Sequence, residues 1–176
     1  SSGNTEAIFQ IESPGFKKFL EDLKPNCLED IIAAVSLYRP GPMDSIPKFV
    51  ESKHNPDKIV FLHPMLKPIL EQTYGCIVYQ EQVMQIVRDL AGFTLGRSDE
   101  VRRAMSKKKT HVMEEERINF VRGNKELGIP GCVGNGISEA VGNRIYDSMI
   151  DFAKYAFNKS HAAAYAVVSY QTAFLK

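Results

Sequence analysis

The fold of this chain is decided by residues 80–90, which read Gln80-Glu81-Gln82-Val83-Met84-Gln85-Ile86-Val87-Arg88-Asp89-Leu90. Val83, Ile86, Val87 and Leu90 recur at the three- and four-residue spacing that places side chains on one side of a helix. This spacing predicts an amphipathic α-helix that packs its apolar side against the rest of the protein.

Helical signals continue on both sides of this stretch. Upstream, Ser13-Pro14 predicts a capped helix start, Pro25 stops that helix, and helices are expected over 28–37 and 45–51. Downstream, helices are expected over 98–108, 110–127, 137–155 and 158–175. Residues 58–62 and 76–79 are candidate short strands, too brief to define a sheet. The prediction is a mainly α, multi-helix fold with at most one short β-hairpin.

The composition is that of an ordinary globular protein. The chain has 176 residues, of which 44% are hydrophobic and 24% charged, enough to build one core. No apolar run approaches the roughly 20 residues that span a bilayer, and the three cysteines have no metal-binding spacing. We expect a cytoplasmic protein with reduced thiols and no membrane contact. Because the chain begins at Ser1 without methionine, we also expect it to be part of a longer polypeptide.

The charge is unevenly distributed along the chain. The net charge of +1 excludes a strongly basic nucleic-acid binder, but residues 1–96 carry 9 Lys/Arg against 12 Asp/Glu, whereas residues 97–176 carry 13 against 9. Any attraction for phosphate groups is therefore expected in the second half.

The first candidate site is the basic stretch Arg102-Arg103-Ala104-Met105-Ser106-Lys107-Lys108-Lys109. On a helix, Val101, Ala104 and Met105 share the buried side, and the arginines and lysines fan over the other. Such a face can pair with phosphate oxygens, and arginine offers a planar, bidentate fork. The alternative is a solvated helix end whose lysines favour the helix dipole.

The second candidate site is Phe157-Asn158-Lys159-Ser160-His161-Ala162-Ala163-Ala164-Tyr165. Asn158 is a good N-cap, which places Lys159 and His161 in the first helical turn, where free N–H groups favour an anion. Tyr165 lies one turn further along the same face and can stack on a base or sugar. The alternative is that His161 and Tyr165 pack against another helix and that the small alanines allow close contact.

Together with three further segments, these two stretches resemble the fingers region of the alpha subunit of bacterial DNA polymerase III, the C-family replicative DNA polymerase. The resemblance runs from about residue 3 to residue 176 and is carried by five ordered motifs. They are Phe9-Gln10-Ile11-Glu12-Ser13, Leu37-Tyr38-Arg39-Pro40-Gly41-Pro42-Met43, Tyr79-Gln80-Glu81-Gln82-Val83-Met84, Arg102-Arg103-Ala104-Met105 and Phe157–Tyr165.

The resemblance implies a division of labour with a palm domain of the same polypeptide, which binds the catalytic Mg²⁺. This chain would then hold no catalytic residue and no metal, and would be inactive alone. The fingers would bind the incoming dNTP and the primer-template DNA, and close over the palm. Contacts to other replisome subunits would lie outside this chain.

By the same resemblance, we assign triphosphate contacts to Arg102, Arg103 and His161, with Lys159 and Asn158 as weaker candidates. His161 would either donate a proton to the leaving pyrophosphate or only contact phosphate. Further DNA- or phosphate-facing candidates are Lys107, Lys108, Lys109, Tyr165, Arg39 and Gln80. The chain departs from the family at Ser106, where the family commonly has glycine.

Two further interpretations are kept beside this one. The chain divides functionally near residues 92–97, into a palm-proximal part (1–93) and a basic, nucleotide-facing part (94–176). The rival function is a non-catalytic helical module that binds the DNA backbone through residues 102–109, with an affinity that falls steeply with salt.

Overall fold

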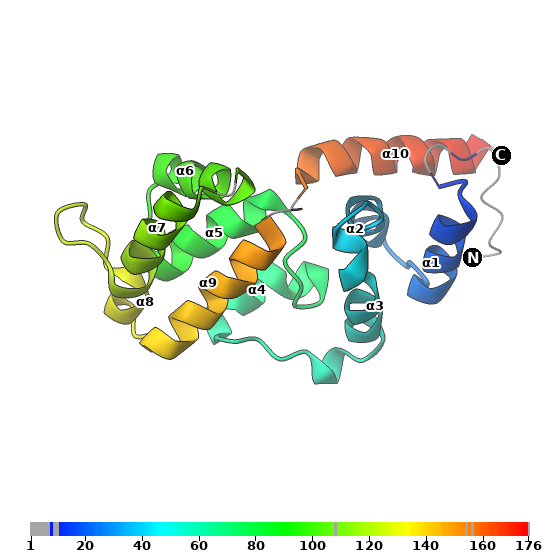
Figure 1. Ribbon diagram of the computed structural model, residues 1–176. Coiled ribbons are helices and arrows are strands. Elements are labelled where there is room, and N and C mark those ends of the chain that lie inside the picture. Colours follow the sequence, from blue (N-terminus) through cyan, green and yellow to red (C-terminus); the bar gives the residue numbers. More distant parts are fainter. Residues whose placement is uncertain (1–7, 9–10, 108, 154, 156, 176) are drawn as a thin grey trace.

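The computed structural model describes residues 8, 11–107, 109–153, 155 and 157–175. The fold is mainly α, as the sequence predicts, and its helices gather into two bodies that lie side by side in Figure 1. The first body contains α1 (Pro14–Leu23), α2 (Leu28–Leu37), α3 (Ile46–His54) and α10 (Lys159–Leu175). The second contains α4 (Lys67–Leu70), α5 (Gln80–Ala91), α6 (Leu95–Ser106), α7 (Thr110–Arg122), α8 (Gly131–Gly134) and α9 (Glu139–Ala153). Short 3-10 turns are η1 (Pro42–Ser45), η2 (Pro56–Lys58), η3 (Pro64–Leu66) and η4 (Glu71–Thr73).

Each body has its own hydrophobic core. In the second body, the apolar side of α5 packs as its spacing predicts, and Val83, Ile86, Val87 and Leu90 are fully buried. In the first body, α10 packs against α2, which lies beneath it in Figure 1, and buries Ala162 and Ala166 completely. These small side chains let the two helix backbones approach each other closely.

Residues 76–79 run between the two bodies without helical structure, and Tyr79 has an extended backbone. Cys76 and Val78 belong to the core of the first body, whereas Ile77 belongs to the core of the second. This alternation is the period of an extended chain, whose successive side chains point to opposite sides. Phe152 of α9 packs against both cores and supports the same junction.

The prediction of two candidate strands is wrong. Among the described residues, 58–62 and 76–79 form no strand, and the second segment makes a single parallel bridge between Tyr79 and Phe157. A small antiparallel pairing occurs elsewhere, where Asn124 and Ile129 exchange hydrogen bonds of 2.7 and 2.9 Å.

The helix expected over 110–127 ends earlier, at Arg122. Gly123 has a φ of +83°, and a Cβ atom at this position would collide with the carbonyl oxygen of Pro130. Only glycine tolerates this backbone and this close approach, so the chain leaves the helix here and turns through Asn124 and Ile129.

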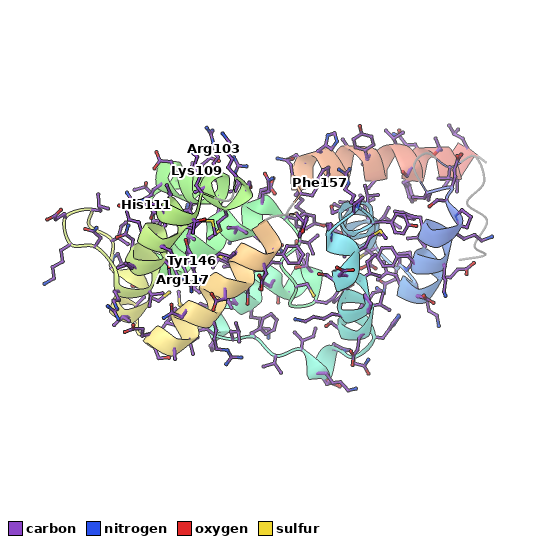
Figure 2. The ribbon with its side chains drawn as sticks, viewed as in Figure 1. Arg103, Lys109, His111, Arg117, Tyr146 and Phe157 are labelled. Carbon is purple, nitrogen blue, oxygen red and sulfur yellow. The ribbon has the colours of Figure 1, made fainter. Side chains whose placement is uncertain are left out.

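Helix α7 is joined to α9 by polar contacts of Arg117 and Tyr146, two residues that Figure 2 labels. The Tyr146 hydroxyl donates to the carbonyl of Met113 at 2.8 Å, and Arg117 lies over the Tyr146 ring and pairs with Asp147 at 2.7 Å.

None of the described helices is both long and apolar enough to cross a lipid bilayer.

Candidate functional site

The turn at the start of α5 is fixed from within by the buried side chain of Gln82. Its Oε1 accepts the N–H groups of Val78 at 2.8 Å and Tyr79 at 3.0 Å. Its Nε2 donates to Thr73 Oγ1 at 2.9 Å and to the carbonyl of Ile69 at 3.2 Å. Every hydrogen-bonding direction of this amide is used, so the backbone at Tyr79 is held in one position.

From this fixed turn, the next two residues reach two other helices. Gln80 donates its N–H to the carbonyl of Phe157 at 3.0 Å, and its Oε1 accepts from Arg102 Nη1, also at 3.0 Å. The Glu81 carboxylate accepts the N–H of Lys159 at 3.1 and 3.2 Å. Three motifs that lie far apart in the sequence therefore meet at one place.

The arginine pair on α6 is organised by Asp99. Its Oδ1 accepts from Arg102 Nε at 2.9 Å and from Arg102 Nη2 at 2.6 Å, and its Oδ2 lies 2.7 Å from Arg103 Nε. Hydrogen bonds from Arg102, together with the charges of both arginines, hold the pKa of Asp99 below its ordinary value. Arg102 is 22% exposed, whereas Arg103 is 65% exposed. Arg102 is thus held in place, and Arg103 reaches into solvent.

Asn158 caps α10, as predicted, because its Oδ1 accepts the N–H of His161 at 3.0 Å. The exposed His161 ring lies between Phe157 and Tyr165, with centroid distances of 5.3 and 4.4 Å and edge-on geometry at both. The alternative, in which His161 and Tyr165 are packing residues, is therefore partly observed, because their rings contact each other one turn apart on α10. The Lys159 ammonium contacts Gln72 Oε1 at 3.3 Å.

Arg39 joins the same group through an aromatic ring. Its guanidinium lies 3.7 Å from the centroid of the Phe157 ring, which is the geometry of a cation–π contact. Figure 2 shows Phe157 at the start of α10, on the side that faces the second body. Arg39 is half-buried, so its contact with Phe157 supports the position of α10.

The first turn of α10 differs from the sequence expectation in one respect. The N–H groups of Lys159 and His161 are already bound by Glu81 and Asn158. The anion at this helix start is thus a carboxylate of the protein itself. Contacts of Lys159 and His161 with a ligand phosphate would therefore come from their side chains.

Lys107 and Lys109, which follow α6, are exposed. Lys107 is the C-cap of α6, and the Lys109 N–H donates to the carbonyl of Ala104 at 3.0 Å. Figure 2 places Lys109 and Arg103 on the edge of the second body formed by α6. Lys108 lies outside the described residues. The Ser106 hydroxyl donates to the carbonyl of Arg102 at 2.9 Å. The helix therefore accommodates serine at this position, where the family commonly has glycine.

Sequence reasoning missed three residues that organise this site: Gln82, Glu81 and Asp99. Asp99 stands three and four residues before the two arginines, which is the spacing of ion pairs on a helix. This spacing is a sequence signal from which the role of Asp99 can be predicted. Glu81 binds Lys159, which lies 78 residues away, so no local pattern announces this contact. Gln82 is the third residue of α5 and bonds groups within residues 69–79.

In the part of the chain that the structure describes, no group of three or more His, Cys, Asp and Glu side chains is arranged to hold a metal ion. The site instead combines three arginines (Arg39, Arg102 and Arg103), a lysine, a histidine and aromatic rings. This chemistry suits phosphate groups and flat rings.

The fold and the site together define a class of protein: a mainly α domain that groups cations and aromatic rings. The chain matches the family model for the bacterial DNA polymerase III alpha subunit finger domain over residues 1–128. It is 47% identical over 176 residues to DNA polymerase III subunit alpha of Staphylococcus aureus (strain MRSA252), covering all of this chain and 16% of that protein. It is also 47% identical over 176 residues to the DNA polymerase III subunit alpha of Halalkalibacterium halodurans, again covering all of this chain and 15% of that protein.

The chain therefore belongs to the family of bacterial DNA polymerase III alpha subunit finger domains. It spans about one sixth of the length of the curated relatives it matches. The family and the mainly α fold predicted from the sequence are thus confirmed.

Proposed function

We propose that this chain is the fingers part of a bacterial replicative DNA polymerase, and that its α6 and α10 face the triphosphate of the incoming dNTP. The observation that carries the proposal is the junction at Gln80 and Glu81, which joins Arg102 to the start of α10. Cations from two helices are thereby gathered on one framework, as electrostatic stabilisation of a triphosphate requires.

The two arginines have different roles in this proposal. Arg102 is bound on both sides, by Asp99 and Gln80, and acts as a fixed positive charge. Arg103 is mostly exposed and can exchange Asp99 for a phosphate oxygen. His161 and Lys159 contact phosphate from α10, and Tyr165 supports the His161 ring through an edge-on contact.

Catalysis requires the rest of the polypeptide. In the proposal, Mg²⁺ is bound by a palm domain outside these 176 residues, and primer-template DNA lies between the palm and the fingers, in the cytoplasm. Closure of the fingers brings the cations to the triphosphate only when the base pair fits. Residues 94–176 supply the nucleotide-facing surface, and residues 1–93 lie nearer the palm. The 176-residue chain alone is expected to show no primer extension.

The experiment is single-nucleotide incorporation by the intact polymerase carrying Arg103→Ala, with nucleotide and primer-template titrated separately. Losing a charge-assisted contact of about 1.5–3 kcal/mol lowers kcat/KM for the nucleotide by about 10- to 100-fold. Primer-template affinity should stay unchanged. Arg88→Ala is the matched control, because Arg88 is an exposed arginine on α5 outside the site.

The rival function predicts the opposite pattern. A helical module that binds the DNA backbone through Arg103, Lys107 and Lys109 would lose primer-template affinity and keep its nucleotide dependence. The exposure of these three cations is the observation that favours this rival. No effect on either titration would refute both functions for this surface.

A further inference from the structure

A cavity of about 490 Å³ opens at the junction of the two bodies, between α3 and α9. Its floor is apolar and is formed by the buried side chains of Leu70, Ile77, Ile86 and Ile145. Its volume lies within the range of about 300–1,000 Å³ that is typical of small-molecule sites, which favour such junctions.

The rim of the cavity carries two exposed cations, Lys48 from α3 and Arg144 from α9. Neither has an ion-pair partner within the described ranges of the chain. The acid on the same rim, Asp147, is already paired with Arg117 at 2.7 Å. The rim is therefore positive above an apolar floor.

The cavity is separate from the site proposed for the triphosphate. Its lining comes from α3, α4, α5, α9 and the segments around residues 60–62 and 75–77, and it includes neither the 79–81 turn nor the basic end of α6. Cys76 of the first core and Ile77 of the second core both line it. A molecule in this cavity would touch both bodies at once.

We propose that this cavity is a binding site for a small organic anion that joins an aromatic or branched apolar body to one acidic group. The apolar body fills the floor, and the acidic group pairs with Lys48 and Arg144. A nucleoside triphosphate does not suit the site, because burying its polyphosphate against the isoleucines would cost desolvation without enough partners. The cavity volume of about 490 Å³ is large enough for one such molecule.

The test uses anilinonaphthalene sulfonate as the probe, an aromatic ring system with a single acidic group, and the intact polymerase that contains this chain. Alkylation of Cys76 is followed by peptide mass spectrometry at increasing probe concentration. Cys76 is only 6% exposed, so it reacts slowly even without the probe and long alkylation times are used. Because Cys76 lines the cavity, the bound probe should slow its alkylation further in a saturable manner. Cys27 lines a different surface pocket with Leu28 and Tyr170 and should be unaffected.

The double variant Lys48→Gln/Arg144→Gln should raise the half-protecting probe concentration about tenfold, which corresponds to about 1.4 kcal/mol. The control Lys17→Gln/Arg88→Gln removes the same charge from exposed positions outside the cavity and should change nothing. The proposal is overturned if Cys76 is not protected, if Cys27 is protected instead, or if both double variants bind the probe equally. A cavity covered by another domain of the polymerase would give the first of these results. Nucleotide incorporation plays no part in the readout, so this test and that of the proposed function fail independently.

Discussion

Gln82→Met is the substitution that most directly tests how the fixed turn at α5 is held. The methionine side chain has about the same volume as glutamine but cannot form the four hydrogen bonds of the Gln82 amide. The buried N–H groups of Val78 and Tyr79 lose their acceptor, and each orphaned donor costs about 1–3 kcal/mol. The expected loss in the free energy of unfolding is therefore about 4 kcal/mol.

For a chain of this size, about 4 kcal/mol corresponds to a fall in Tm of about 8–16 °C. The assay is urea and thermal denaturation followed by far-UV circular dichroism. Gln85→Met is the matched control on the same helix, because Gln85 is exposed and bonds only Asp89 among the described residues, at 3.2 Å. It should change stability by less than about 0.5 kcal/mol. A loss below about 1 kcal/mol for Gln82→Met would refute the argument that this amide holds the turn.

Two further predictions concern buried groups. Burial raises the pKa of Asp30, but hydrogen bonds from Lys53 (2.7 Å) and Tyr74 outweigh it, so the pKa lies below its ordinary value. The stability from this carboxylate is therefore present above about pH 4 and lost as pH falls through the lowered pKa. Lys53→Met should cost about 3–5 kcal/mol at neutral pH, with a smaller cost in acid. Exposed Lys58→Met is the control, and a cost that does not depend on pH would contradict this reasoning. Burial also raises the pKa of Cys132 to about 12, so exposed Cys27 should be alkylated far faster, and equal rates measured by mass spectrometry would disprove this burial.

Much of the fold could be predicted from the sequence because helix signals are local. The apolar spacing of residues 80–90, the Ser13 and Asn158 caps and the Pro25 stop each depend on neighbours within a few residues. Local signals extend the helix over 110–127 too far, because the early end at Gly123 depends on the approach of Pro130, which no local pattern contains. The apolar run 76–79 resembles a strand in sequence, because a segment between two cores buries its side chains alternately on either side.

The sequence alone determined the helical class, the uneven charge, the capped starts of the helices and the five motifs that identify the family. Which residues meet was decided only by the tertiary structure: Arg102 on Gln80, Glu81 on the N–H of Lys159, and Arg39 on the Phe157 ring. The same holds for the cavity between the bodies. Helix propensity and capping act over one or two turns, whereas hydrogen bonds between distant segments depend on the hydrophobic cores that hold those segments together.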